Sequence, residues 1–223
     1  MTRTPKPLSD TDKVALAGKT YVLFGASSGL GRGVALKLAT AGVNLVLAAR
    51  RTTLLNEIAL KATLAGSEVS VITGDISQPE DVQTVLQDAI AHFTTVDVWI
   101  NFVGVGAIGP FWDIPVEDHA RLIDVNLKGL IFSSHGALRQ FRTQGYGTLI
   151  NLGSIDSEVP LAYQASYSAS KAGVLSLGRV LNEELRLADL SDTIKVSTIM
   201  PWALDTPWWD HAANYSGGTR AWA

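Results

Sequence analysis

Short apolar runs alternate with helical segments along most of the chain, and this alternation constrains the fold more than any other feature. The first apolar run is Thr20–Phe24, and residues 31–41 follow it with helical spacing. The other expected strands are residues 43–49, 69–73, 96–102, 147–152 and 194–200, and the other expected helices are residues 51–64, 79–93, 116–141 and the segment around Tyr167. Strands that alternate with helices form a parallel sheet with helices on both faces. The sequence therefore predicts an α/β fold with a doubly wound parallel sheet.

The length of 223 residues suits one sizeable domain. Hydrophobic residues make up 47% of the chain and charged residues 17%, which is typical of a buried core and not of disorder. Residues 1–18 contain Pro5, Pro7 and scattered charges, so we expect a loose N-terminal arm there. We expect residues 19–223 to form a single domain.

Composition and charge exclude several classes of function. The absence of cysteine removes disulfides, thiolate metal sites and cysteine nucleophiles. A net charge of −3 gives no electrostatic case for binding nucleic acid or an anionic membrane. The four histidines form no ligand motif, so we expect no metal site. The N-terminus is too polar for a signal peptide, and the apolar runs fall short of the ~18 residues of a membrane span, so we expect a cytoplasmic protein.

A glycine-rich turn joins the first expected strand to the first expected helix. Gly25, Gly29 and Gly31 are spaced G-x3-G-x-G. Glycines in this position let the backbone approach a pyrophosphate and place it at a helix N-terminus, where free N–H groups favour negative charge. The same glycines also suit a tight turn that binds nothing. The turn predicts a dinucleotide site if the rest of the chain carries matching chemistry.

A hydroxyl, a phenol and an ammonium group occur close together in the second half of the chain. Tyr167 and Lys171 are four residues apart, so one face of a helix presents both. Ser154 lies thirteen residues before Tyr167, just after the expected strand 147–152. Hydride transfer to a carbonyl leaves an alkoxide that a phenol can protonate, and a nearby ammonium lowers the phenol pKa from about 10. Separately, each residue type also suits a structural role in the core, in solvent or as an N-cap.

Together these motifs resemble the short-chain dehydrogenase/reductase family, and the resemblance extends over residues 19–207. The glycine spacing, the Ser154–Tyr167–Lys171 set and Asn126 in the run Asp-Val-Asn-Leu-Lys-Gly carry it. The resemblance implies a Rossmann-type fold and hydride transfer between a nicotinamide and a carbonyl/alcohol substrate. It implies that Tyr167 is the general acid/base, that Lys171 lowers its pKa and that Ser154 polarises the carbonyl. It also implies that Asn126 holds a water that links Lys171 to solvent.

The resemblance further implies a set of cofactor contacts along the strand ends. These residues are Gly25, Ser27, Ser28, Gly29, Leu30, Gly31, Asp75, Ile76, Asn101, Gly104, Tyr167, Lys171, Pro201 and Thr206. Asp75 matches the adenine-contacting aspartate of the family, although a lone aspartate also suits a turn cap. Thr206 matches the threonine that contacts the nicotinamide carboxamide.

The end of the second expected strand indicates which dinucleotide binds. An acidic residue there would bind the ribose 2′-hydroxyl and repel a 2′-phosphate. The sequence instead reads Ala48-Ala49-Arg50-Arg51, and a guanidinium suits a phosphate in charge and geometry. We predict NADP(H) over NAD(H), with Arg50 as the main contact and Arg51 as a second. Arg51 alternatively begins a solvated helix.

The chain departs from the family pattern in three places. Phe102 and Val103 replace the usual Asn-Ala after the fourth strand, and Trp202 replaces the glycine that usually follows Pro201. No seventh strand is visible, so we expect the sixth to have an exposed edge unless a dimer contact covers it, or the domain to be C-terminally incomplete. Residues 202–223 hold four of the six tryptophans and suit an apolar lid, with His211 as a candidate substrate contact.

These observations predict an NADP(H)-dependent oxidoreductase of the carbonyl reductase or alcohol dehydrogenase type. Two alternatives remain open. One is an NAD-dependent alcohol dehydrogenase of the same fold, and the other is a dinucleotide-binding protein without turnover. The expected partner is a small-molecule carbonyl or alcohol, with neither nucleic acid nor membrane. The family resemblance implies a homodimer or homotetramer that associates through the long helices.

Overall fold

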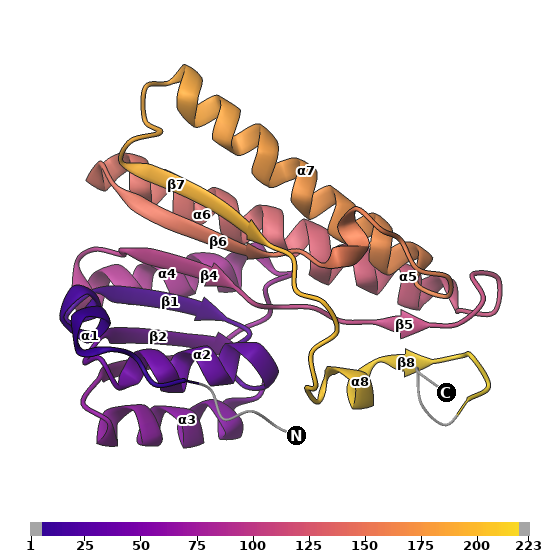
Figure 1. The fold of residues 1–223 in the computed structure, drawn as a ribbon, viewed down its shortest axis with the longest axis horizontal. Coiled ribbons are helices and arrows are strands. Elements are labelled where there is room, and N and C mark those ends of the chain that lie inside the picture. Colours follow the sequence, from indigo (N-terminus) through magenta and orange to yellow (C-terminus); the bar gives the residue numbers. More distant parts are fainter. Residues whose placement is uncertain (1–5, 219–223) are drawn as a thin grey trace.

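The computed structural model describes residues 6–218 and contains a six-stranded parallel sheet. The strands are β1 (Thr20–Phe24), β2 (Asn44–Ala49), β3 (Glu68–Thr73), β4 (Val98–Asn101), β6 (Gly147–Leu152) and β7 (Ile194–Ile199). The spatial order β3-β2-β1-β4-β6-β7 changes direction between β1 and β4 (Figure 1). The predicted doubly wound parallel sheet is therefore confirmed, and its switch point is the place where such sheets bind ligands.

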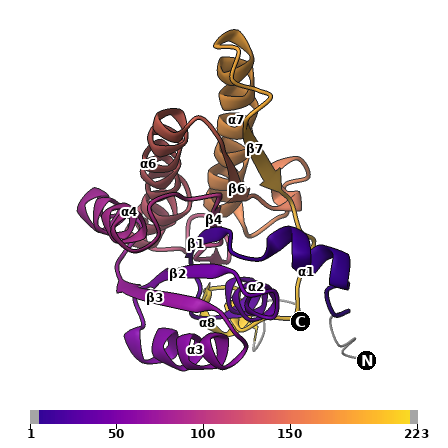
Figure 2. The same ribbon diagram turned by 90° about the vertical axis from the view of Figure 1, so that its left-hand side faces the viewer.

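Helices cover the sheet in two layers, which Figure 2 shows end-on. The helices are α2 (Gly29–Ala39), α3 (Thr52–Leu64), α4 (Pro79–Phe93), α5 (Val116–Ile123), α6 (Gly129–Gln144) and α7 (Ala165–Leu187). Leu23 and Leu45 pack against α2 and α3 on one face of the sheet, and Val22 and Leu149 pack in the other cluster with α4, α6 and α7. Residues 6–218 contain no helix with the length and apolarity that crossing a membrane requires.

The two strands at the β7 end are less completely buried than β1. Burial alternates residue by residue along β6 and through the first half of β7, whereas every residue of β1 is buried. Alternating burial is typical of a sheet with one solvated face. Within residues 6–218, β7 is an edge strand of this sheet, so the structure agrees with the expectation of an exposed edge.

The long helix expected over residues 116–141 is interrupted at Asn126, the residue predicted to take part in the site. A π-helical turn, Asp124–Lys128, separates α5 from α6 and contains Asn126. Gly129 follows, where an added Cβ would lie 2.8 Å from the carbonyl oxygen of Ile76. A π-turn inserts an extra residue into a helix and is frequent at functional sites. Sequence periodicity over a long helix does not reveal a defect of this length.

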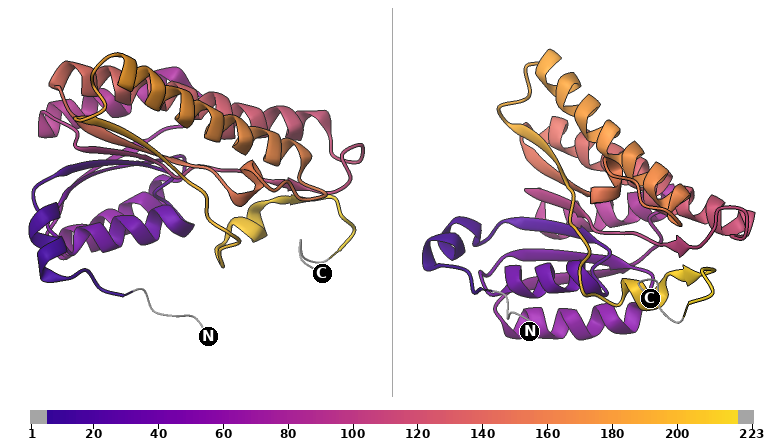
Figure 3. Two further views of the ribbon diagram at one scale, coloured as in Figure 1. Left: turned by 45° about the horizontal axis from the view of Figure 1, so that its top comes forward. Right: turned by 45° about the vertical axis from the view of Figure 1, so that its right-hand side comes forward.

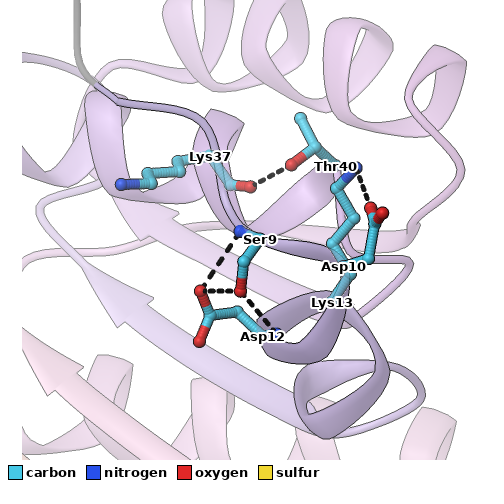
Figure 4. A network of polar contacts seen from close by, with 6 residues as sticks. All are labelled: Ser9, Asp10, Asp12, Lys13, Lys37 and Thr40. Carbon is cyan, nitrogen blue, oxygen red and sulfur yellow. Dashed lines mark hydrogen bonds and ion pairs between the residues drawn. The ribbon is translucent and has the colours of Figure 1, made fainter.

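The N-terminal arm is more ordered than expected. Residues Asp10–Leu16 form α1, which begins with a capping box between Ser9 and Asp12 (Figure 4). Ser9 accepts a hydrogen bond from the Asp12 N–H at 3.1 Å, and Asp12 accepts one from the Ser9 hydroxyl at 2.6 Å. Leu8 and Leu16 pack against the core cluster of α2 and α3. A capping box and two apolar contacts are enough to fix a short helix on the domain.

A second, two-stranded sheet was not predicted from the sequence. β5 (Ala107–Ile108) pairs in parallel with β8 (Ala213–Asn214), and α8 (Trp208–His211) precedes β8. Figure 3 shows this C-terminal segment crossing from the end of β7 to lie beside β5. Strands of two residues carry no periodic signal, and their partners lie about a hundred positions apart. The pairing places residues 201–215 against the site described below.

Candidate active site

A cavity of about 460 Å³ lies at the carboxyl-terminal ends of the sheet strands. Residues that end or directly follow β1, β2, β3, β4 and β6 line it, and residues 201–212 contribute a further wall. This edge is where open parallel sheets bind their ligands. Most of the predicted site residues line this cavity, and Gly31, Asn101 and Asn126 do not.

The glycine-rich turn lines the cavity and needs its glycines. A Cβ on Gly25 would lie 2.4 Å from the Phe102 carbonyl oxygen, and one on Gly31 would lie 2.2 Å from the Gly25 carbonyl oxygen. Helix α2 begins at Gly29, and its N-cap Ser28 makes no side-chain capping bond, so the first N–H groups of α2 are not capped by that side chain. Gly25, Ser27, Ser28, Gly29 and Leu30 line the cavity, whereas Gly31 packs behind the turn. An uncapped helix N-terminus behind a close-packed turn suits a pyrophosphate.

Both arginines after β2 line the cavity. The Arg50 guanidinium lies 3.8 Å from the Asp75 carboxylate, and its side chain is 55% exposed. Arg51 donates a hydrogen bond to the Ser27 hydroxyl at 3.2 Å. Arg51 is thus hydrogen-bonded to the glycine-rich turn, while it also stays exposed and directly precedes α3. Two guanidinium groups therefore follow β2, and the strand is not followed by an acidic residue.

Asp75 and Ile76 also line the cavity, directly after β3. The Asp75 carboxylate accepts hydrogen bonds from the Ser77 N–H at 2.9 Å and from the Ser77 hydroxyl at 2.8 Å. The turn-capping role of Asp75 is therefore present in the structure together with its position on the cavity. Ile76 is only 3% exposed and packs beside Gly129.

Asn101 lies inside the sheet and not on the cavity wall. Its side-chain oxygen accepts hydrogen bonds from the Ser133 hydroxyl at 2.6 Å and the Trp99 indole at 3.2 Å. Its amide nitrogen donates to Asn151 at 2.9 Å, and Asn151 donates to Ser134 at 3.1 Å. All five residues are buried, so this is a closed polar network under β4 and β6. Sequence resemblance placed Asn101 at the cofactor, whereas its side chain braces the sheet.

Tyr167 and Ser154 lie together at the cavity, in the first turn of α7 and directly after β6. A side-chain hydrogen bond links them and favours the ionised phenol, but burial raises the pKa of Tyr167 to about 12, and the charge of Asp156 adds to the increase. In the structure, burial thus outweighs the Ser154 hydrogen bond in setting the direction of the Tyr167 pKa. Ser154 also accepts a hydrogen bond from the Asp156 N–H at 3.2 Å, so its hydroxyl has a capping role as well.

Lys171 is fixed inside the site. Its side chain is 1% exposed, and its ammonium donates a hydrogen bond to the Leu152 carbonyl at 2.8 Å. Burial lowers the pKa of Lys171 to about 8. The ammonium lies 5.8 Å from the centre of the Tyr167 ring, and a Cβ on Gly104 would lie 3.6 Å from it. Gly104 thus leaves space beside the ammonium on the cavity side.

The Asn126 side chain is fully engaged with protein. It is completely buried, accepts a hydrogen bond from the Val105 N–H at 2.8 Å and donates to the Val105 carbonyl at 2.9 Å. Its amide also donates to the Ser170 hydroxyl at 3.3 Å. The side chain therefore clamps the loop after β4 to α7, one residue from Lys171.

The segment after β7 supplies the remaining wall. Pro201 and Thr206 line the cavity, and Thr206 lies beside Gly29, whose added Cβ would be 3.5 Å from it. The Trp208 ring packs at 5.4 Å from the Tyr167 ring, so part of the expected aromatic lid lies on the phenol. Trp202 lines the cavity but is 64% exposed. His211 also lines the cavity, and Trp222 lies outside the described residues.

Sequence reasoning missed several cavity residues. Asp156, Arg121, Leu161 and Gln164 line the cavity with the residues described above. Asp156 is the most unusual, because it is an acidic side chain that is only 4% exposed. Its place two residues after Ser154 is visible in the sequence, and an acid so close to a candidate catalytic serine is a signal that could have identified it.

A family model described as short chain dehydrogenase matches residues 19–215. This match spans most of the chain and includes the turn, the Ser154–Tyr167–Lys171 set and the segment after β7.

The chain belongs to the short-chain dehydrogenase family.

Individual members of the family support the assignment. The chain is 34% identical over 198 residues to 3β-hydroxysteroid dehydrogenase 1 of Eggerthella lenta, covering 86% of this chain and 73% of that protein. A short-chain dehydrogenase/reductase of Burkholderia phymatum in complex with NAD has a TM-score of 0.84 and 30% identity, covering 88% of this chain and 69% of that one. An alcohol dehydrogenase of Thermococcus sibiricus complexed with 5-hydroxy-NADP has a TM-score of 0.79 and 27% identity, covering 87% and 80%. As a short-chain dehydrogenase, the chain is an oxidoreductase.

Proposed function

We propose that this short-chain dehydrogenase transfers a hydride between NADP(H) and a carbonyl/alcohol substrate. The observation that supports this most strongly is that Tyr167, Ser154 and Lys171 line the same cavity as the glycine-rich turn. Proton-transfer groups beside a dinucleotide cradle are what reversible carbonyl reduction requires.

The residues present fit a dinucleotide. The cavity volume of about 460 Å³ lies in the range of small-molecule sites. Gly25 and Gly29 have φ values of +83° and +52°, which allow the turn to bend closely over the helix N-terminus. Thr206 and Gly104 would border the nicotinamide half, and Asp75 the adenine half. When bound, the dinucleotide supplies or accepts the hydride.

The preference for NADP(H) rests on Arg50 and Arg51. The 3.8 Å pairing of Arg50 with Asp75 is longer than a hydrogen bond, so the N–H donors of Arg50 stay available to a 2′-phosphate. Arg51 sits against Ser27 and adds a second positive charge. The relatives include structures with NAD and with a modified NADP, so the arginines carry this part of the proposal.

Three side chains would perform the proton chemistry. The Ser154 hydroxyl donates a hydrogen bond to the substrate oxygen and holds it beside the phenol. The Tyr167 phenol gives its proton to that oxygen during reduction and takes one from the alcohol during oxidation. A phenol with a pKa of about 12 is almost entirely protonated near neutral pH, which suits its role as the proton donor in reduction. Lys171 stabilises the tyrosinate by its charge.

Asn126 would act as a positioning residue. Its three hydrogen bonds to Val105 and Ser170 hold the loop after β4 against α7, near Lys171. We assign the predicted water-holding role to the backbone of the π-helical turn around Asn126, because the N–H donors of the Asn126 side chain already bind Val105 and Ser170.

The test is a titration of the purified chain with NADPH and NADH, followed by quenching of tryptophan fluorescence, and then a carbonyl screen. We expect NADPH to bind at least about tenfold more tightly, since a lost charged contact costs about 1.4 kcal/mol or more. Tyr167→Phe should leave this binding intact and lower turnover by about a thousandfold. Tight binding with no turnover in the wild type would instead indicate the non-catalytic alternative.

The association state belongs to the same proposal. Helices α6 and α7 expose Ile131, Val180 and Leu187, which are 42%, 51% and 74% exposed. Apolar side chains on two adjacent helices suit self-association through these helices. A sedimentation measurement that gives a monomer at micromolar concentration would exclude it.

A further inference from the structure

Asp156 carries a buried carboxylate that the protein itself does not satisfy. The side chain is 4% exposed, and its Oδ1 atom has no hydrogen-bond partner among residues 6–218. Within the same residues, its carboxylate forms no ion pair. A buried acceptor without a partner costs free energy, and native proteins keep few of them. Oδ1 is closed to the cavity, whereas Oδ2 is not among these closed atoms and accepts no hydrogen bond from residues 6–218, so a ligand group would reach the carboxylate through Oδ2.

The other ionisable side chains of the cavity either interact with other residues or form no ion pair with Asp156. The Lys171 ammonium donates to the Leu152 carbonyl, and Arg50 faces Asp75. Arg121 and His211 line the cavity without an ion pair to Asp156. The carboxylate is therefore available to a bound molecule.

The position of Asp156 relates it to the reacting carbonyl. It lies in the 3₁₀ turn Ile155–Ser157, and its N–H donates to the Ser154 hydroxyl at 3.2 Å. Its charge also acts on the Tyr167 phenol. The backbone of Asp156 is thus bonded to the hydroxyl that would hold the substrate oxygen, and both residues line the same cavity. A substrate held by Ser154 and Tyr167 would therefore lie in the cavity that Asp156 lines.

We propose that Asp156 is a specificity residue that selects substrates with a hydrogen-bond donor, a hydroxyl or protonated amine, one or two carbons from the reacting carbonyl. This inference rests on the proposed carbonyl/alcohol chemistry. An ionised carboxylate only accepts hydrogen bonds, and its bonds to donors are stronger than neutral ones. A substrate without the donor leaves the carboxylate desolvated and unpaired, and sites of this kind reject such analogues strongly. The substrate class is therefore α- or β-hydroxy ketones, their amino analogues and the corresponding diols.

Matched ketones test the proposal. Hydroxyacetone and butanone differ only by a hydroxyl in place of a methyl group, and so do α-hydroxyacetophenone and propiophenone. With NADPH, we expect kcat/KM for the hydroxy ketone to exceed that of its partner at least about tenfold in the wild type. In Asp156→Leu the ratio should fall to about one, because the acceptor is gone. Aminoacetone separates the two donors: Asp156→Asn should retain part of the hydroxyl preference and lose any preference for the ammonium.

A neighbouring acid provides the matched control. Glu158 lies in the same loop but pairs with Arg179 at 2.6 Å and does not line the cavity, so Glu158→Gln should keep the wild-type ratio. The ratio is insensitive to folding and to cofactor affinity, since both ketones meet the same enzyme. A wild-type ratio near one, or an unchanged ratio in Asp156→Leu, overturns the proposal.

A binding measurement separates this inference from the proposed function. If no ketone is reduced, the proposed activity fails, and the affinity of the NADP⁺-loaded protein for propanediol relative to propanol then tests Asp156 alone. We expect the diol to bind about tenfold more tightly to the wild type and equally with propanol to Asp156→Leu. Equal binding in the wild type contradicts the role of Asp156 whatever the activity.

Discussion

The two halves of the cavity are built in different ways. The nucleotide half consists of backbone: the turn from Gly25 to Gly31, the uncapped start of α2, and strand ends that the sheet holds in register. The substrate half consists of side chains on segments far apart in the chain, such as Tyr167 with Trp208, and the Tyr215–Asp118 hydrogen bond supports this wall from outside the cavity. Backbone geometry that recurs can be recognised from sequence spacing, whereas side-chain assembly depends on contacts that the sequence does not display.

The two halves also differ in whether their charged side chains have a partner within the protein. In the nucleotide half, Arg50 and Arg51 each have a side-chain partner, Asp75 and Ser27. In the substrate half, Asp156 is buried without one. We infer that the nucleotide half is already arranged for a fixed ligand and that the substrate half is completed by the molecule it selects.

The largest effect on dinucleotide binding is expected at a glycine where one stretch of backbone packs directly on another. Gly31→Ala places a Cβ 2.2 Å from the Gly25 carbonyl oxygen, so the turn must move. Overpacking of this kind costs about 3 kcal/mol, which corresponds to about a hundredfold weaker dinucleotide binding if the displaced turn carries the cost. Fluorescence titration with NADPH measures it.

Gly33→Ala is the matched control for this prediction, because a Cβ there meets no atom within 4 Å. The substitution in the same helix should leave binding unchanged and stabilise α2 by up to about 1 kcal/mol. Equal losses of NADPH affinity in both variants would mean that helix formation, and not the close approach of the turn, controls the nucleotide half.

The turn at Gly25 is an example of what could be predicted from the sequence. The doubly wound parallel sheet and the tight turn at Gly25 could be predicted, because the alternation of strands and helices and the glycine spacing are visible in the sequence. The π-turn at Asn126 and the β5–β8 pair could not be predicted, because one extra residue in a helix and two-residue strands leave no periodic signal. Asp156 was missed for a different reason, since burial of a charge is a tertiary property.

The pH dependence of turnover tests Tyr167 and Lys171, whose side chains lie between the two halves of the cavity. Below its pKa of about 12 the Tyr167 phenol is protonated, so its ionised fraction rises about tenfold per pH unit across the assay range. Between about pH 6 and pH 7, where Lys171 with a pKa of about 8 is mostly charged, kcat/KM for alcohol oxidation should rise about tenfold. Reduction, which uses the protonated phenol, should change less than about twofold. A plateau in the oxidation profile near neutral pH would show that bound cofactor lowers the phenol pKa.

A smaller effect is expected from the arginines of the nucleotide half. Arg50→Ala should weaken NADPH binding about tenfold and leave NADH binding unchanged, since only the former carries a 2′-phosphate. Arg51→Ala should have a weaker effect on NADPH, because its guanidinium already donates to Ser27. Parallel titrations of both variants with both cofactors check this. A larger loss in Arg51→Ala would make Arg51 the main phosphate contact.

The smallest effect is expected at the far end of the substrate half, and it tests whether the halves are independent. Tyr215 donates a hydrogen bond to Asp118 at 2.5 Å, and its N–H donates to the Ile108 carbonyl at 2.7 Å, so it fastens β8 beside β5. Tyr215→Phe removes the side-chain bond and keeps the backbone bond, so the ketone KM should rise only about threefold. The affinity for NADPH should not change, because Tyr215 does not line the cavity. The same substitution at Tyr146, whose hydroxyl makes no hydrogen bond within residues 6–218, should change neither quantity. If Tyr215→Phe weakened NADPH binding as much as it raised the ketone KM, the segment after β7 would couple the two halves through Thr206.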